Sequence, residues 1–589
     1  MKKQIVGLLL VAAMLSGCGT ADNAGTAKPS EDSKAVSSET SKETSKETVK
    51  ESEYPDYLNL DGYRPIVKEG EEITLTAFSQ RSGMAESDVN EDIWFTQFVE
   101  QVLNINMEID NPRGEAIAER KSLMFASGEL PDLLLNANIT NAYAVNYGIE
   151  GQLLLPLSDY FSEELTPNIL AFLEENPSVK AEITAPDGKI YAMPNLGASV
   201  PGAGDTVAGN DKLWLDKAYM EAIGRTEVPQ TLDEFVEMLR EIKALNPADF
   251  GVDEIWPLVA TMGYDRMYFN YAFGWISADN DDLANPFLDT QTGEVVVPVA
   301  QEEKFSDYVK LYHTLYTEGL IHEDYFTLDT EGQRALIAEK CVGVVGDATT
   351  DTARPGEEDN FLYAGALTSK WSDKAVLKAN SALSTGVTAV SADTEYPELC
   401  LRLIDYLYTP EGSLYSMHGP LHGSEDCLGM TEGISYDAET KTIIYHDVES
   451  GEFEGSWPYM VQKLKWAFHS AGNEYLAYEH IRELSGLSGL EFPEPSTTAA
   501  KQMYEAAKGH LVSKLPGFYM DAETTTRYTD LYTVLNDHLT TEFAKFVVGQ
   551  RSLDELPKFF EELKAMGLDE YVQMVNDAYT DFEWDGVIK

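Results

Sequence analysis

Cysteine, histidine and serine most often carry metal or nucleophilic chemistry, and their spacing in this chain supports neither. Nine histidines are present without an H-E-x-x-H motif, and no G-x-S-x-G motif occurs. His418 and His422 are four residues apart, but a Gly-Pro pair between them argues against a shared helical face. Three cysteines beyond residue 18 lack C-x-x-C spacing: Cys341, Cys400 and Cys427. We interpret them as buried small hydrophobes, with one disulfide, Cys400 to Cys427, as the alternative.

Residues 1–18, MKKQIVGLLLVAAMLSGC, have the pattern of a secretory signal peptide. Lys2 and Lys3 precede an apolar run that is shorter than the roughly 20 residues of a membrane span. The ending Leu15-Ser16-Gly17-Cys18 resembles the lipobox of bacterial lipoproteins, which implies acyl chains such as palmitate on Cys18 and removal of residues 1–17. The alternatives are an uncleaved anchor and an ordinary secreted protein. We expect a lipid-anchored protein on the extracellular face of the cell membrane, of Gram-positive type.

The next segment, to about residue 55, is predicted to be a disordered spacer. It is composed mainly of Ser, Thr, Lys, Glu, Ala and Gly, and it contains the tandem SKETSKET. Such a composition buries too little apolar surface to offset the entropy of ordering. The spacer therefore places the rest of the chain at a distance from the membrane.

Composition indicates a large acidic globular body. The formal net charge is −57, which disfavours nucleic acid as a partner. The chain is 43% hydrophobic, which is enough for large cores, and its 589 residues suggest two or more lobes. No later apolar run reaches membrane-spanning length, so we expect a soluble body attached to the membrane only through its N-terminal lipid.

The first part of this body alternates strands and helices. Apolar periodicity predicts strands at 71–80 and 105–109 and helices at 93–103 and 115–127, and LPDLLLNAN then suggests another strand. This alternation predicts a mostly parallel sheet with helices on both faces, whose ligand crevice opens at the carboxyl ends of the strands. Four polar residues end or follow predicted strands and are candidate ligand contacts: Gln80, Arg81, Asn136 and Asn138.

Several segments, in this order, resemble the extracellular solute-binding proteins of carbohydrate-type ABC importers, and in particular their long lipoprotein subgroup. FASGELPDLLL, EGQLLLPLSDYF and DGKIYAMPN are similar to parts of the family's first lobe. Residues 211–247 match its strand, helix, Pro-Thr start and second helix, and Thr231 with Glu234 forms a capping-box pattern. Further similarity lies at 310–326, 341–348, 396–423 and 542–582.

The resemblance implies an α/β, two-lobe, periplasmic-binding-protein-like fold of type II, with an interlobe cleft, a hinge and a helix-rich C-terminal part. The N-lobe would comprise 66–195 and about 370–418, and the C-lobe about 196–369 and 419–589. Crossings between the lobes are expected near Asn195, Lys370 and His418. The implied function is capture of an extracellular solute, most plausibly an oligosaccharide, for delivery to the permease subunits of an ABC transporter.

Sugar binding requires aromatic faces for the rings and planar polar groups for the hydroxyls. Four tryptophans lie in irregular polar or Pro-flanked sequence and are the candidate aromatic contacts: Trp275, Trp371, Trp457 and Trp256. Candidate hydrogen-bonding residues in the C-lobe are Tyr264, Asp265, Arg266 and Asp347. Trp94, Trp214 and Trp466 lie in apolar segments and are predicted to belong to the core.

Some long members of the family carry an EF-hand-like calcium loop after the helix that ends here at Leu245. The corresponding run, NPADFGVDEIW, has Phe250 where an oxygen ligand is wanted and is one residue short of the alternate-ligand pattern. This departure argues against bound calcium, so we expect neither a metal nor another cofactor.

Two alternatives to solute capture remain open: a lipid-anchored glycoside hydrolase and a glycan-binding adhesion or sensing protein. Hydrolysis requires paired carboxylates at about 5–10 Å. A chain with 100 acidic residues contains such pairs by chance, so their abundance favours neither reading. We expect a binding protein without catalytic residues, whose ligand the sequence does not name.

Overall fold

The computed structural model describes residues 54–79, 93–112, 116–197, 212–261, 263–278, 282–347, 354, 356–447, 451–454, 471–491, 498–580, 582–584 and 586. The chain divides into two compact units, Met1–Glu53 and Tyr54–Lys589, and all described residues belong to the second. Cys18, Gln80, Arg81 and Trp457 therefore lie outside the described residues. Within the described part, no helix combines the length and apolar composition needed to cross a membrane.

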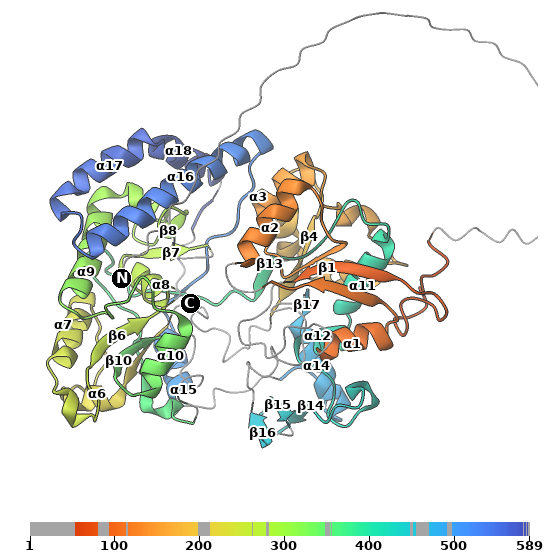
Figure 1. Cartoon of the computed structure of the whole chain (residues 1–589), viewed down its shortest axis with the longest axis horizontal. Helices are drawn as coiled ribbons and strands as arrows, with labels where there is room; N and C mark the ends of the chain where they lie inside the picture. The colour runs from red at the N-terminus through yellow and green to blue at the C-terminus, as the bar shows by residue number, and fades with distance from the viewer. Residues whose placement is uncertain are drawn as a thin grey trace, which may run out of the picture. The chain divides into compact units, whose positions relative to one another are not determined.

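The N-lobe is built on a six-stranded mixed sheet (Figure 1). Its order is β17 (Gly472–Asn473), β4 (Ala192–Leu196), β13 (Leu383–Val390), β3 (Leu133–Leu135), β1 (Thr74–Ser79) and β2 (Asn106–Asp110). Strand β1 is parallel to β2 and β3, as the alternation predicts, whereas β13 is antiparallel to both β3 and β4. The strands predicted at 71–80 and 105–109 are confirmed.

Most helices of the N-lobe bury apolar residues in its core. The helices are α1 (Trp94–Gln101), α2 (Ala116–Ser127), α3 (Asn141–Tyr143), α4 (Pro167–Glu175), α5 (Pro177–Ile183), α11 (Pro397–Leu407), α12 (Pro410–Met417) and α14 (Glu474–Leu484). Helix α1 buries Trp94, Phe95 and Phe98, and Trp94 is a core residue as predicted. A second N-lobe cluster, around Phe125 and Tyr191, packs beneath α2.

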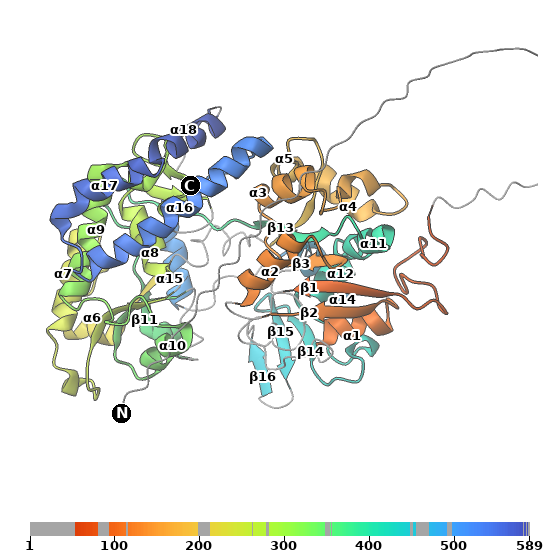
Figure 2. The same cartoon turned by 45° about the horizontal axis from the view of Figure 1, so that its top comes forward.

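The described residues of the C-lobe form three small sheets, and strands of the two larger ones are labelled in Figure 1 and Figure 2. The largest has the order β11 (Phe361–Tyr363), β5 (Leu213–Asp216), β10 (Val342–Gly346) and β6 (Trp256–Ala260), with β10 parallel to β6. A meander consists of β7 (Trp275–Ser277), β8 (Phe287–Asp289) and β9 (Glu294–Val296). The third sheet pairs β12 (Leu377–Lys378) with β18 (Leu511–Val512).

One large apolar cluster joins these sheets to the C-lobe helices. The helices are α6 (Lys217–Ala222), α7 (Leu232–Lys243), α8 (Tyr264–Ala272), α9 (Glu302–Thr317), α10 (Thr330–Ala338), α15 (Thr498–Ala507), α16 (Ala522–Val547), α17 (Leu556–Ala565) and α18 (Leu568–Ala578). The predicted cap of α7 is present: Thr231 Oγ1 accepts from the Glu234 N–H at 3.2 Å. The Glu234 carboxylate, however, accepts from the Gln230 N–H rather than from that of Thr231.

The lobe boundaries differ from the prediction in the second half of the chain. The hairpin β14 (Gly433–Asp437) and β15 (Thr442–Asp447), which β16 (Gly451–Glu454) extends, was predicted to belong to the C-lobe. Its Ile434, Ile443 and Tyr445 are buried in the N-lobe core, together with Ala477 and Ile481 of α14. The chain therefore remains in the N-lobe after His418 and returns to the C-lobe core only with α15.

The crossings before this point lie closer to the prediction. Strand β4 of the N-lobe ends at Leu196 and β5 of the C-lobe begins at Leu213, and the first crossing, near Asn195, stays a prediction. The second lies between β12 and β13, about ten residues after Lys370, because Trp371 and Leu377 still pack in the C-lobe core.

The three described cysteines are free and buried. The Cys341 thiol donates to the Leu336 carbonyl and the Cys427 thiol to that of Leu421, while Cys400 is a core residue of the N-lobe. Their interpretation as small hydrophobes is confirmed, and the alternative Cys400–Cys427 disulfide is not formed.

Candidate functional site

Strand topology places several predicted residues at the edges where ligand crevices open. Asn136 directly follows β3 and is 7% exposed; its side-chain nitrogen has no hydrogen-bond partner among the described residues. Asp347 directly follows β10, and Tyr264 opens the helix that comes after β6. Asn136 and Asp347 therefore lie at the carboxyl ends of strands, where the sequence places them, and the structure adds Tyr264 near the carboxyl end of β6.

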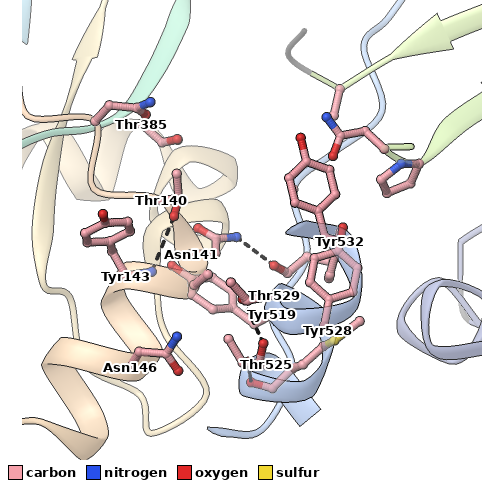
Figure 3. A pocket seen from close by; sticks show the side chains of 18 of the residues that line it. Thr140, Asn141, Tyr143, Asn146, Thr385, Tyr519, Thr525, Tyr528, Thr529 and Tyr532 are labelled. Atoms are coloured by element: carbon pink, nitrogen blue, oxygen red, sulfur yellow. Dashed lines mark hydrogen bonds between the residues drawn. The ribbon is translucent and has the colours of Figure 1, made fainter. Parts of the chain in front are cut away.

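The most prominent cavity among the described residues has a volume of about 490 Å³ and is lined from both lobes. We call it the seam cavity. Its N-lobe wall includes Asn138, Thr140, Asn141, Tyr143, Asn146 and Tyr147. Its C-lobe wall includes Phe518, Tyr519, Thr525, Tyr528, Thr529 and Tyr532. Figure 3 shows the two walls with Tyr519 between them.

The N-lobe wall is a short helical segment that follows β3. Thr140 caps it by accepting from the Tyr143 N–H, and α3 continues into a π-helical turn, Ala144–Glu150. Tyr143 and Tyr147 are four residues apart, with ring centroids separated by 5.1 Å. Phe125 of α2 contacts both rings and so fixes the aromatic wall against the N-lobe.

The C-lobe wall is formed by residues 513–521, which we call the strap, and by the first turns of α16. Tyr528 and Tyr532 are again four residues apart, so both lie on one face of the helix. Tyr528 stacks on Tyr571, with ring centroids 4.9 Å apart, and the Tyr532 hydroxyl donates to Asp282. Thr525 Oγ1 donates to the Met520 carbonyl and closes the corner between strap and helix (Figure 3).

The strap contacts both lobes. Phe518 packs against Tyr528 and Tyr579 of the C-lobe, whereas Tyr519 packs on the N-lobe cluster around Phe125. Asn141 Nδ2 donates to the Phe518 carbonyl at 2.9 Å, a polar link between the two walls.

The seam cavity is electrically neutral. Among its described lining residues only Glu182 and Lys514 carry formal charges, and they lie 3.8 Å apart as an ion pair. Burial raises the pKa of Tyr143, and burial raises the pKa of Tyr519 and of Tyr528 to about 12. These tyrosines are therefore neutral at physiological pH. The cavity offers aromatic faces, hydroxyls and amides, which is the chemistry that recognises uncharged polyhydroxylated molecules.

Comparison with known proteins identifies the architecture. No family model matches the chain. It is 22% identical over 531 residues to the fructooligosaccharide ABC transporter substrate-binding protein FusA of Streptococcus pneumoniae, an alignment that covers 90% of this chain and 94% of FusA. This chain is a relative of the ABC-transporter substrate-binding proteins and shares their fold. The resemblance predicted from the sequence is thus confirmed.

Solved structures support the two-lobe solute-binding-protein fold. FusA in complex with kestose matches with a TM-score of 0.68 and 21% identity, covering 86% of this chain and 99% of FusA. An HMO-binding solute-binding protein of Bifidobacterium longum infantis matches with a TM-score of 0.64 and 17% identity, covering 86% of this chain and 98% of its own. Alginate-binding AlgQ2 without calcium ion gives a TM-score of 0.64 at 19% identity, over 87% of this chain and 98% of AlgQ2.

Of the predicted ligand residues that the structure describes, only Asn138 lines the seam cavity of this solute-binding-protein fold. Trp275, predicted beside the cleft, is fully buried in the C-lobe core. Its indole N–H donates to Gln301, and the Lys304 ammonium lies 4.9 Å from its ring centroid. An irregular, acid-rich flanking sequence was the basis of the prediction, but the tryptophan itself begins the buried strand β7.

The other tryptophans have structural neighbours. Trp256 begins β6, at the strand end opposite to the carboxyl edge, and its ring lies 4.2 Å from that of His322. Trp371 packs half-buried on the C-lobe core, and its indole N–H donates to Asp307. Neither lines the seam cavity.

The polar cluster after β6 is largely internal. Asp265 is completely buried and accepts hydrogen bonds from the Tyr312 and Tyr325 hydroxyls, and burial raises its pKa. Tyr264 is buried against Gly346 at the end of β10. Asp265 therefore organises the core beneath the strand edge, whereas ligand roles for Tyr264, Arg266 and Asp347 stay predictions.

The residues that sequence reasoning missed are tyrosines. The chain has 31 tyrosines and eight tryptophans. The predicted aromatic ligand contacts were tryptophans, so the pairs Tyr143/Tyr147 and Tyr528/Tyr532 were not among them. A signal was present: each pair is spaced i,i+4, which places two rings on one face of a helix.

The loop compared with a calcium site is closed by an aromatic pair. Phe250 stacks on Tyr219 with ring centroids 4.4 Å apart and an interplanar angle of 6°. Asn246 Nδ2 donates to the Asp249 carboxylate within the same loop. No described group of three or more His, Cys, Asp or Glu side chains is placed to hold a metal ion. Phe250 thus supplies ring packing at the position where a calcium loop of this kind has an oxygen ligand, and the absence of calcium stays a prediction.

Calcium is therefore expected to leave stability unchanged. Adding millimolar CaCl₂ or EDTA should shift the melting temperature by less than about 1 °C, because a site that does not bind the ion gains nothing by mass action. Thermal unfolding followed by circular dichroism checks this. A rise of several degrees that EDTA reverses would show that the loop binds calcium.

Proposed function

We propose that this chain captures a neutral extracellular oligosaccharide in the seam cavity and delivers it to the permease subunits of an ABC importer. The observation that carries the proposal is the described lining of that cavity, which consists of tyrosine rings from both lobes, amides and hydroxyls between them, and one ion pair among the described residues. A ligand that contacts both walls stabilises their approach, so binding and lobe closure are linked.

The neutral lining of the seam cavity favours an uncharged ligand over an anionic one. A uronate or a phosphorylated sugar requires a cation that is free to pair with it, and the one cation among the described lining residues is engaged by Glu182. The strongly negative net charge of the chain opposes an anionic ligand further. Tyrosine faces match the C–H surfaces of sugar rings, and Asn138, Asn141 and Asn146 offer both donors and acceptors.

The named relatives support a saccharide ligand. FusA is described as a fructooligosaccharide-binding protein, and its structures hold kestose or fructo-nystose. A further match, an N-glycan transport solute-binding protein of Streptococcus pneumoniae in complex with Man5GlcNAc, has a TM-score of 0.52. The same architecture thus accommodates several different oligosaccharides.

A glycan panel tests the function. Isothermal titration of the mature chain, lacking residues 1–17, with neutral fructo-, gluco-, manno- and galacto-oligosaccharides should yield at least one micromolar or tighter ligand that chromatography recovers intact. Uronate oligosaccharides of equal length are the matched controls and should not bind. Preference for the uronates, or no binding across the neutral series, contradicts the proposal.

The principal rival is a glycoside hydrolase. Such an enzyme needs two carboxylates about 5–10 Å apart at its site. Glu182 is the one acidic side chain among the described residues of the seam cavity, and it is paired with Lys514. Shortening of a bound glycan in the chromatogram would favour the enzyme instead.

Lipid attachment at Cys18 is the second part of the proposal. The tether would keep the binder near its permease and raise its local concentration. Cys18→Ser is expected to move most of the protein from the membrane fraction to the culture medium, measured by immunoblot, with glycan affinity unchanged. Retention of the variant at the membrane would contradict lipidation at this residue.

A further inference from the structure

Helix α2 carries a lysine in an unusual environment behind the seam cavity. The Lys121 ammonium donates a hydrogen bond of 2.7 Å to the Asn138 carbonyl. It also lies 4.0 Å from the centroid of the Tyr143 ring. Asn138 and Tyr143 both line the cavity, whereas Lys121 does not. One side chain outside the cavity thus contacts two residues of its wall.

Lys121 is half-buried, and no described carboxylate pairs with its ammonium to offset the loss of hydration. Its neighbour Arg120 is bonded to Asp110, the acidic residue at the end of β2, so that charge is already engaged. The titratable group that faces Lys121 from the packed helix α3 is Tyr143, whose own pKa is raised by burial. Among the described residues, the ammonium of Lys121 contacts a backbone carbonyl and an aromatic ring.

We propose that Lys121 is a positioning residue for ligand binding: its ammonium fixes the Tyr143 ring and the Asn138 carbonyl in the geometry that the sugar requires. This inference rests on the proposed function. The cation occupies one face of Tyr143, while Phe125 and Tyr147 contact the ring from other directions. The ring is therefore held for contact with a ligand in the cavity.

Protonation controls both contacts. A cation–π interaction and a charge-assisted hydrogen bond require the ammonium and weaken when it becomes an amine. Burial lowers the pKa of Lys121 from 10.5 to about 8. Glycan affinity should accordingly fall as the pH rises from 7 to 9.5, by about three- to tenfold.

Stability has the opposite pH dependence. The unfolded chain keeps Lys121 protonated up to its ordinary pKa of 10.5, whereas the folded chain releases that proton near pH 8. Because the unfolded state binds more protons between these values, the contribution of Lys121 to stability rises with pH across that window. Removing the charge at pH 7 is therefore not expected to lower the melting temperature, although it weakens binding.

A first experiment needs no ligand. In protein labelled with ¹³C at the lysine ε-carbon, the Lys121 resonance, assigned by its loss in Lys121→Arg, should be shifted upfield by the Tyr143 ring and should titrate near pH 8. Tyr143→Leu should remove the upfield shift. An unshifted resonance that titrates near 10.5 overturns the inference, whether or not a ligand is known.

A second experiment uses the tightest neutral glycan from the panel. Lys121→Met should weaken binding at pH 7 by about three- to tenfold and abolish the decline between pH 7 and 9.5. Lys121→Arg, which keeps a cation at all these pH values, should bind without that decline. Lys180→Met, an exposed lysine on α5, is the matched control and should behave as the wild type.

The outcomes separate the two proposals. If the wild type binds no glycan but the Lys121 ε-carbon resonance is shifted upfield and titrates near pH 8, the proposed function is wrong, while the contact between Lys121 and Tyr143 is confirmed. If glycans bind with an affinity that is flat in pH and unchanged in Lys121→Met, the positioning role is wrong and the function stands.

Discussion

Replacing Trp275 with alanine is expected to lower the free energy of unfolding by about 3–5 kcal/mol. The side chain is fully buried among Phe273, Tyr308 and Lys304, so its removal leaves a cavity that the core cannot fill. The substitution also leaves Gln301 Oε1, which accepts a hydrogen bond of 2.7 Å from the indole N–H, without this donor. Urea unfolding of the mature chain, followed by circular dichroism, measures the effect.

Trp371→Ala serves as the comparison. This ring is only half-buried on the same core and should cost less than half as much. Glycan affinity of the folded fraction of Trp275→Ala should equal that of the wild type. If Trp275→Ala had the stability of the wild type but had lost glycan affinity, Trp275 would be a ligand contact, and its placement in the core would be contradicted.

The largest functional effect is expected from removing one tyrosine on each wall of the seam cavity. Tyr143→Ala and Tyr532→Ala should each weaken binding of the tightest neutral glycan about ten- to a hundredfold, because each ring supplies a large apolar face at the centre of the contact. The double variant should fall below detection in isothermal titration.

A double-mutant cycle makes this prediction sharper. If both rings contact one sugar chain, the two losses should be coupled rather than additive. Tyr504→Ala, a half-buried tyrosine of α15 outside the cavity, is the matched control and should bind as the wild type. Wild-type affinity in both single variants would show that the ligand binds elsewhere.

Regular patterns explain what the sequence predicted well. Alternation over residues 71–80 specifies β1, and the pair Thr231 and Glu234 specifies the start of α7, because both signals are local. The strand ends followed from topology, so Asn136 and Asp347 were placed at the carboxyl edges of the sheets. The resemblance supplied the lobes themselves, which no local pattern specifies.

Non-local packing explains what the sequence did not predict. The local sequence of the hairpin at 433–447 does not indicate that Ile434 and Tyr445 are buried in the N-lobe, because their burial depends on packing against residues far away in the chain. Trp275 was misplaced for the same reason: an acid-rich flank suggested a surface loop, whereas the meander β7–β9 buries the strand. The polarity of flanking residues therefore predicts burial poorly where a buried strand ends next to a polar turn.

The seam cavity was missed because it joins segments that lie far apart in the chain. Its N-lobe wall lies near residue 143 and its C-lobe wall near residue 528, so no spacing connects them. Each i,i+4 tyrosine pair was visible alone, yet only tertiary structure shows that the two pairs face one cavity.

The strap has a consequence for the order in which the protein becomes functional. Residues 513–521 and the start of α16 provide most of the C-lobe wall of the seam cavity, and they come later in the chain than β17 and β11, the last strands of the N-lobe sheet and of the largest C-lobe sheet. A nascent chain can complete its N-lobe sheet and the largest C-lobe sheet yet still lack half of its binding surface. A glycan present during synthesis and export would therefore find no complete site until α16 and the residues before it are folded. A proteolytic cut after α15 would abolish glycan binding while leaving both of these sheets intact.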